Sequence, residues 1–290
     1  MKILCLHGKG TSGRILETQT AAFRRRLQAL KRETQLIFDF VDGPLAADPA
    51  PSIDQFFKGP FWSFYQSADI DNLRSAHAWL LEVIKRQGPY DGILAFSQGC
   101  ALAATLMLEI QAGVVRTEAS RHRQQPFKFA IFICGGLPLT YFAGRGYAVS
   151  DAAWQYDEQA RLALSSQASF NALLQCGSQR WNQQDWTTLD NDKHSSSSHP
   201  ESQLATTVFG LDLAQVADAH KIPIPTVHIY GSKDPRKGSA LQLAGMCRPG
   251  ITKVACHGGG HDIPRTSEAS DLIAKLILWA ATETRNTEEN

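Results

Sequence analysis

Short apolar runs alternate along the chain with longer segments whose apolar residues recur every three or four positions. Each apolar run has the length of a β-strand and is followed by a turn rich in glycine or polar residues. The runs cover Lys2–Leu6, 35–41, Gly92–Phe96, 127–134, 226–230 and 251–255. Strands that are apolar throughout are typical of a parallel sheet buried on both faces. The pattern therefore predicts a mainly parallel sheet of about six strands.

Amphipathic helical patterns lie between or after these runs. Their apolar residues form three groups, namely Leu16, Phe23, Leu27 and Leu30; Leu73, Ala76, Leu80 and Ile84; and Leu272, Ile273, Leu276 and Trp279. Each group would place one apolar helix face against the sheet. The alternation of strands and helices predicts an α/β fold with helices on both faces of the sheet. Residues 283–290 are polar, and we expect a frayed C-terminal tail there.

The stretch 137–220 interrupts this regularity. Within it, residues 175–202 are rich in Gln, Asn, Ser and Asp, a composition that does not favour a packed core. Strand patterns resume after this stretch. We therefore interpret it as a lid-like insertion in a single domain that spans residues 1–290.

Composition and charge exclude several classes of protein. With 29 basic and 28 acidic residues, the chain offers no charge excess for binding nucleic acid. No apolar run is long enough to span a membrane, and the apolar start of the chain is too short for a signal peptide. The six cysteines form no C-x-x-C pair, which argues against a disulfide framework or a metal site. We expect a cytoplasmic protein without a cofactor or metal.

A glycine-rich loop, residues 7–13, follows the first predicted strand. It lacks the G-x-x-x-x-G-K-[ST] pattern of a phosphate-binding loop. Gly8, Gly10 and Gly13 have the spacing of a dinucleotide-binding fingerprint, and Asp42 follows the second predicted strand. A dinucleotide-binding fold is therefore a minor alternative. His7 is interpreted as a residue that holds this loop.

Ser97 lies between an apolar run of strand length and one of helix length. That is the setting of a nucleophile elbow, in which a sharp turn lifts a serine hydroxyl above the sheet. The usual pattern there is G-x-S-x-G, and this chain has Ala95 and Gly99 at the two glycine positions. Alanine adds one methyl group, so the position stays small. Without further support, the motif also fits a plain buried strand, turn and core helix.

Two more polar residues follow predicted strands and complete a possible catalytic triad. Asp234 and His261 come after Ser97 in the order serine, acid, histidine, which is that of α/β-hydrolases. Carboxyl ends of parallel strands share one edge of a sheet, so the three side chains are expected to meet there. His261 would take the Ser97 proton, and Asp234 would orient the imidazole. His257 and Asp262 are the competing histidine and acid.

Hydrolysis of an acyl group also needs donors for the oxyanion of the tetrahedral intermediate. The backbone N–H of Gln98, at the start of the helix after the serine, is expected to supply one. The backbone N–H of Lys9, directly after the first strand, is expected to supply the other. Neither role requires a particular side chain.

Four segments together resemble the fungal serine hydrolase family of α/β-hydrolases. These segments read LCLHGKGTSG, GPYDGILAFSQG, HIYGSKD and HGGGHDIP. The resemblance spans both ends and the centre of the chain and weakens within 137–220. It places the family's nucleophile on Ser97, its acid on Asp234 and its histidine on His261. The family usually has glycine where this chain has Ala95.

The resemblance implies a serine hydrolase acting on an ester or an acyl thioester. Family members include esterases and thioesterases that release polyketides in fungal secondary metabolism, so an acyl carrier domain of a polyketide synthase is an expected partner. A general carboxylesterase is the alternative, and a catalytically idle binding protein is the alternative from another class. The same site would also permit a cyclising or carbon–carbon cleaving acyl transfer. Aromatic residues after the second strand, namely Phe61, Trp62, Phe64 and Tyr65, are expected either to line an acyl pocket or to fill the core.

Overall fold

The computed structural model describes residues 1–30, 35–115, 124–166, 187–189, 207–208, 211–212 and 216–288. Its main sheet has the strand order β2-β1-β5-β6-β10-β11-β7. The predicted parallel strands are present as β1 (Lys2–Leu6), β2 (Ile37–Val41), β5 (Gly92–Phe96), β6 (Phe129–Ile133), β10 (Thr226–Gly231) and β11 (Thr252–His257). All five pairings between these strands are parallel. The predicted α/β-hydrolase type of sheet is therefore confirmed.

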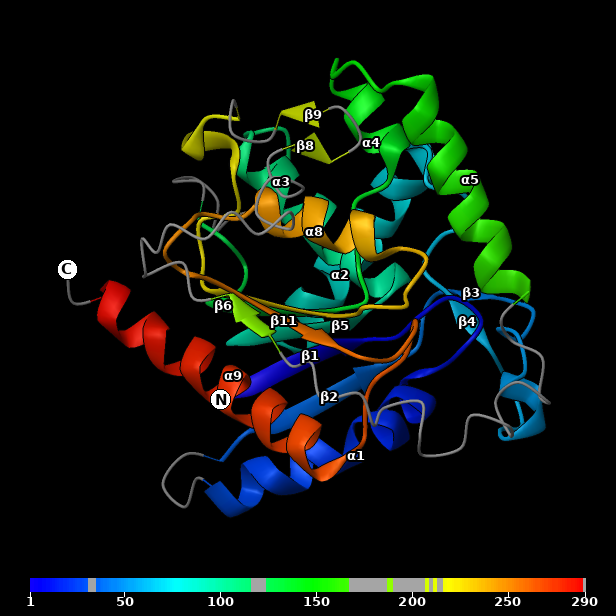
Figure 1. Cartoon of the computed structure of the whole chain (residues 1–290). Helices are drawn as coiled ribbons and strands as arrows, with labels where there is room; N and C mark the ends of the chain where they lie inside the picture. The colour runs from blue at the N-terminus through cyan, green and yellow to red at the C-terminus, as the bar shows by residue number, and fades with distance from the viewer. Residues whose placement is uncertain are drawn as a thin grey trace.

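Helices cover both faces of this sheet (Figure 1). On one face lie α1 (Gly13–Leu30) and α9 (Ser267–Glu288), and on the other lie α2 (Ile70–Gln87), α3 (Gln98–Gln111) and α8 (Lys237–Gly245). Side chains alternate along each strand, so Ile3 and Cys5 of β1 join the core under α1 and α9. Leu4 and Leu6 join the core under α2 and α3. Helix α9 continues to Glu288, beyond residue 282, where we expected fraying to begin.

The expected insertion contains more regular structure than its composition suggested. It includes the helices α4 (Leu139–Gly144) and α5 (Asp151–Ser166) and the strand β7 (Thr187–Leu189), which pairs antiparallel with β11. A short hairpin of β8 (Thr207–Val208) and β9 (Leu211–Asp212) follows, and η5 (Asp218–His220) ends the stretch. The expectation of an irregular stretch was wrong for these elements. Most of the polar segment 175–202 lies outside the described residues.

The segment between β2 and α2 also differs from a plain loop. It contains η1 (Ile53–Gln55) and a small antiparallel pair of β3 (Leu45–Ala46) and β4 (Trp62–Ser63). An isolated bridge joins Thr11 to Trp62. The aromatic segment is therefore pinned to the loop after β1, at the carboxyl edge of the sheet.

Strand order decides which loops meet at that edge. Strand β1 lies beside β5, so the loop after β1 adjoins the loop that begins the helix α3. Strand β10 lies beside β11, and only β6 separates this pair from β5. The three loops after β5, β10 and β11 therefore converge, although they are far apart in the sequence.

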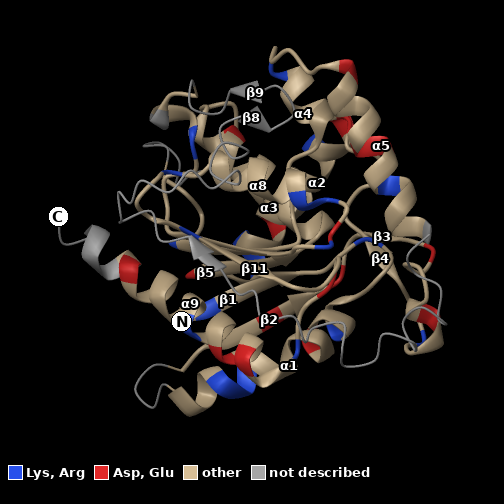
Figure 2. Ribbon diagram, in the orientation of Figure 1, with Lys and Arg blue, Asp and Glu red and all other residues tan. Residues whose placement is uncertain are grey.

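The outer surface carries both signs of charge. Figure 2 shows Lys and Arg interspersed with Asp and Glu over the helices that cover the sheet. Among the helices that the structure describes, none combines the length and the apolar character needed to cross a membrane.

Candidate active site

Ser97 occupies a strained turn between β5 and α3. Its backbone has φ 52° and ψ −112°, a region that side-chain-bearing residues seldom adopt, and its N–H donates to the Ile133 carbonyl at 3.0 Å. A Cβ on Gly99 would lie 2.6 Å from the carbonyl oxygen of Leu6, so only glycine fits at this crossing of helix and strand. Ala95, which stands where the usual motif has glycine, is fully buried. These constraints are those of a nucleophile elbow.

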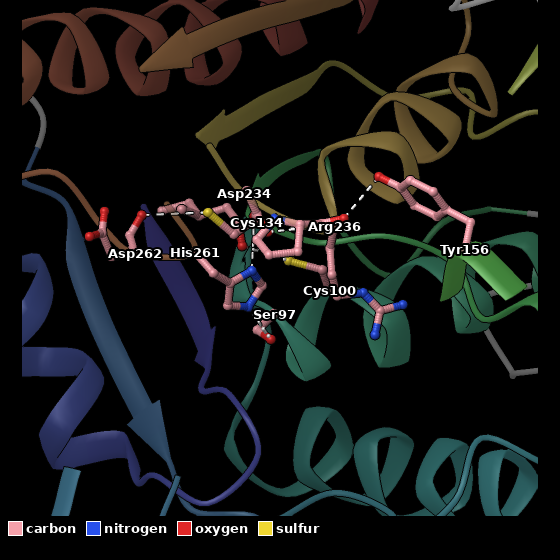
Figure 3. A network of polar contacts seen from close by, with 10 residues as sticks. Ser97, Cys100, Cys134, Tyr156, Asp234, Arg236, His261 and Asp262 are labelled. Atoms are coloured by element: carbon pink, nitrogen blue, oxygen red, sulfur yellow. Dashed lines mark hydrogen bonds and ion pairs between the residues drawn. The ribbon is translucent and has the colours of Figure 1, made fainter. Parts of the chain in front are cut away.

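His261 lies between Ser97 and Asp234 (Figure 3). Its Nε2 atom is 2.8 Å from the Ser97 hydroxyl oxygen, and its Nδ1 atom is 2.8 Å from Oδ2 of Asp234. The three side chains predicted from the sequence therefore form one hydrogen-bonded chain. The competing histidine, His257, instead accepts the N–H of Gly259 at 3.1 Å. The sequence favoured His261 over His257 because the second histidine follows the glycine turn.

The turn after β10 and the turn after β11 interlock. The N–H of Lys233 donates to the carbonyl of Gly259 at 3.0 Å, and that of Ser232 donates to His257 at 2.7 Å. Gly231 has no room for a Cβ because the carbonyl oxygen of Gly260 lies against it. These backbone contacts fix the acid turn relative to the histidine turn.

The Asp234 carboxylate is held ionised. Burial alone would raise the pKa of this side chain, but the hydrogen bond from His261, the electrostatic interaction with that ring and the N–H of Arg236 together lower the pKa below its ordinary value. The Arg236 N–H donates to Oδ1 at 2.8 Å, and Oδ2 faces the imidazole. An ionised carboxylate at Nδ1 keeps the proton on that nitrogen and leaves Nε2 as an acceptor for the serine hydroxyl.

The loop after β1 lies against the serine. A Cβ built on Gly8 would be 3.5 Å from Cβ of Ser97. His7 fixes this loop as predicted, because its Nε2 accepts the N–H of Gly43 at 3.0 Å while its Nδ1 lies 2.6 Å from the Gly8 carbonyl. Burial lowers the pKa of His7, which keeps the ring neutral and able to accept from Gly43. Within the described residues, the backbone N–H groups of Lys9 and Gln98 donate to no protein acceptor.

The Gln98 side chain has a role that the sequence did not reveal. Its Oε1 accepts the N–H of Phe64 at 3.0 Å and the hydroxyl of Ser63 at 3.1 Å, and its Nε2 donates to the Tyr65 carbonyl at 2.7 Å. These bonds tie the first residue of α3 to the aromatic segment. The sequence signal was a glutamine after the elbow serine, but nothing along the chain indicated its partners.

Two of the four aromatic residues that follow the second strand are buried in the core, and the other two are half-buried near the site. Phe64 is buried and packs between His7 and Trp79, with ring centroids 4.6 Å and 5.4 Å away. Tyr65 is buried in the same core. Phe61 and Trp62 remain half-buried beside the loop after β1, since Trp62 exchanges backbone hydrogen bonds with Gly10 and Thr11. The core-filling alternative therefore describes Phe64 and Tyr65.

The fold and this site define an α/β-hydrolase with a serine–histidine–aspartate arrangement on an elbow. Residues 1–273 match the serine hydrolase (FSH1) family. The chain is 28% identical to the esterase FPY3 of Fusarium mangiferae over 98% of each chain. It is 36% identical to the esterase FUS5 of Gibberella moniliformis, over 95% of this chain and 85% of that one. Among solved structures, a pyrethroid hydrolase from Sphingobium faniae JZ-2 matches with 14% identity and a TM-score of 0.48 over 97% of each chain.

The protein belongs to the serine hydrolase (FSH1) family, and it is a hydrolase enzyme. The resemblance deduced from the four sequence segments is thereby confirmed. The dinucleotide-binding alternative is excluded by the family match, which includes the glycine-rich loop.

Proposed function

We propose that this hydrolase cleaves an ester or acyl thioester through an acyl-Ser97 intermediate. The observation that carries the proposal is the continuous hydrogen-bonded chain from the Ser97 hydroxyl through His261 to Asp234. In the first half of the reaction, Ser97 Oγ attacks the acyl carbon while His261 Nε2 takes the hydroxyl proton. The imidazolium then returns that proton to the leaving oxygen or sulfur, and the acyl group stays on Ser97.

The second half repeats the chemistry with water. His261 Nε2 removes a proton from water, which attacks the acyl-Ser97 carbonyl, and the Ser97 oxygen recovers the proton as the acid leaves. In both halves, negative charge develops on the former carbonyl oxygen. The N–H groups of Gln98 and Lys9 are the proposed donors to it. Gln98 follows Ser97 in the chain, Gly8 before Lys9 lies against Ser97, and neither N–H donates to an acceptor among the described residues. Loss of such a donor typically raises the barrier by about 2.7–4 kcal/mol.

For the acyl group, we propose an apolar chain, with thioester release from an acyl carrier domain of a polyketide synthase as the specific reaction. Support comes from the half-buried Phe61 and Trp62 beside the loop after β1, which offer apolar contact at the active edge. A thiolate also leaves more readily than an amine, so the site needs little acid assistance. A general carboxylesterase is the alternative, and it fits the esterase names of the relatives.

For the compartment, we propose the cytoplasm. The described cysteines are free thiols, as is usual in a reducing compartment.

Labelling with a fluorophosphonate tests the nucleophile. The wild-type protein should form one covalent adduct, mapped to Ser97 by peptide mass spectrometry, and Ser97→Ala should abolish it. Ser232→Ala, at an exposed serine near the acid, is the matched control and should label normally. Labelling that persists in Ser97→Ala, or a wild-type protein that does not label, would leave the idle binding protein as the better description.

A series of substrates distinguishes the thioesterase from the general carboxylesterase. Acyl thioesters on pantetheine, on coenzyme A and on an acyl carrier domain are compared with p-nitrophenyl esters of equal chain length. The thioesterase proposal expects the highest kcat/KM on the carrier-bound thioester and a rise with chain length. Equal kcat/KM for all chain lengths would contradict an apolar acyl pocket.

A further inference from the structure

Cys134 directly follows strand β6 and lies beside the acid of the site. Its backbone φ is 49°, an uncommon value for a residue with a side chain, and the residue is buried. The thiol donates to the carbonyl oxygen of Asp262 at 3.5 Å, and its sulfur lies within 4.8 Å of a carboxylate oxygen of Asp234 (Figure 3). None of the proposed hydrolytic steps uses this thiol.

Cys134, Asp234 and His261 bring a sulfur, an oxygen and a nitrogen donor together. One donor atom from each residue lies within 4.8 Å of those of the other two. Four ligands at about 2.0–2.3 Å from a tetrahedral cation are separated by roughly 3.2–3.8 Å from one another. The site therefore needs only small side-chain shifts to surround a cation. The Asp262 carbonyl oxygen, which accepts the thiol, lies 3.5 Å from the sulfur.

We propose that Cys134, Asp234 and His261 form an inhibitory binding site for a thiophilic divalent cation such as Zn²⁺ or Cd²⁺. Thiolate, imidazole and carboxylate form the ligand set that zinc prefers over the hard cations Mg²⁺ and Ca²⁺. The His261 side chain is 14% exposed, whereas that of Asp234 is fully buried, so the cation would enter on the histidine side. Cation binding does not depend on the proposed function, but inhibition does.

Binding exchanges protons for the cation. The cation takes the place of the proton on His261 Nδ1 and of the thiol proton of Cys134, so two protons are released while Asp234 stays ionised. A neutral imidazole that is bound through Nδ1 carries its proton on Nε2. That nitrogen then donates to the Ser97 hydroxyl, 2.8 Å away, and no longer accepts its proton. The occupied enzyme therefore loses its base while the fold stays intact.

The test measures p-nitrophenyl ester hydrolysis by the full chain in metal-free buffer with added Zn²⁺ or Cd²⁺. The wild type should be inhibited, and EDTA should restore its activity. Cys134→Ser and Cys134→Gly, the latter suited to the positive φ, should raise the half-inhibiting concentration roughly 10-fold or more. Cys247→Ser is the matched control and should behave as wild type. Cys247 is also buried, and its thiol donates a hydrogen bond to the Leu243 carbonyl. Each variant is compared with its own uninhibited rate.

Direct binding is measured on Ser97→Ala, which keeps all three ligands but lacks the nucleophile. One equivalent of Cd²⁺ should produce thiolate-to-metal absorption in the ultraviolet, and the added Cys134→Ser change should remove it. This readout works even if the protein hydrolyses none of the esters, so failure of the proposed function remains distinguishable. Absence of this absorption in Ser97→Ala, or equal inhibition of wild type and both Cys134 variants, would overturn the proposal.

Discussion

Nη2 of Arg236 lies 2.9 Å from Oδ1 of Asp157, and this ion pair links helix α5 to the turn that carries Asp234. The hydroxyl of Tyr156 adds a second link by donating to the Pro235 carbonyl at 2.8 Å. The backbone N–H of the same Arg236 donates to Asp234. One residue thus contacts both the inserted helix and the acid of the site, so α5 is anchored at the point where the triad is assembled.

Asp157→Asn is expected to have a small effect on the chemistry. Both side chains of the ion pair are 29% exposed, and such a pair contributes about 0.2–1 kcal/mol. The backbone bond from Arg236 to Asp234 does not depend on it, so kcat should fall less than about 5-fold, the factor that 1 kcal/mol represents. Steady-state kinetics and urea unfolding measure the two effects. Tyr156→Phe is the matched control for the second link. A loss as large as that of a triad variant would show that α5 positions Asp234.

Asp234→Asn should lower kcat by about four orders of magnitude, because an amide favours the wrong imidazole tautomer and no longer stabilises the imidazolium. Asp262→Asn, at the neighbouring acid, should change kcat by less than about 10-fold, since Nδ1 of His261 is already hydrogen-bonded to Asp234 at 2.8 Å. Both variants are compared by ester hydrolysis and by circular dichroism. A severe loss of kcat in Asp262→Asn alone would show that Asp262, and not Asp234, is the acid of the triad.

Gln98→Leu should reduce kcat more than it raises KM. The variant keeps the backbone N–H but loses three side-chain hydrogen bonds to the aromatic segment, each of which contributes about 1 kcal/mol. The start of α3 then loses its link to this segment, and the oxyanion donor is held less firmly. Gln98→Glu keeps the two accepting contacts and sets a carboxylate oxygen against the Tyr65 carbonyl. Unchanged kcat in both variants would limit Gln98 to its backbone role.

Gly99→Ala should destabilise the fold by about 1–3 kcal/mol or more, because its Cβ would lie 2.6 Å from the Leu6 carbonyl oxygen. Gly260→Ala is the matched control near the site, since no atom lies within 4 Å of the position its Cβ would take. Guanidinium unfolding of the two variants gives the comparison. Equal stability of both would mean that the elbow can open without penalty.

His77→Gln should make the protein less sensitive to acid. Burial lowers the pKa of His77 from 6.5 to about 4 in the folded protein, and its Nε2 contacts the Thr105 hydroxyl at 2.8 Å. Between those pH values only the unfolded chain takes up the proton. The free energy of unfolding therefore falls as the pH drops below 6.5, by on the order of 3 kcal/mol near pH 4, and does not change from this source above 6.5.

Urea unfolding at pH 7 and at pH 4.5 measures this contribution. Other groups also titrate across that range, so the quantity of interest is the difference between wild type and His77→Gln in their loss of stability. Glutamine can keep a hydrogen bond to Thr105 without titrating. Equal losses in the two proteins would show that His77 does not contribute to acid sensitivity.

Much of the architecture was readable from periodicity. The central strands β5, β6 and β10 were predicted because they are buried on both faces and are therefore apolar along their length, whereas β2 at the edge and β11 are only partly buried. The inserted helix α5 was missed because its buried face is narrow, and Trp154, Tyr156 and Leu162 are exposed on it. Strand β7 was missed because it has only three residues and depends on pairing with β11.

The sequence by itself determined the elbow, the order of serine, acid and histidine, and the loop after the first strand, because local chain geometry requires those residues there. The sequence favoured His261 over His257, and only the tertiary structure decided the contacts of each, His261 with Ser97 and His257 with Gly259, since both histidines flank one glycine turn. The tertiary structure also decided the partners of Gln98 and Cys134, whose contacts come from distant strands and loops. Side chains with local constraints can be recognised in a sequence, whereas side chains defined by long-range contacts can be recognised only when the chain is folded.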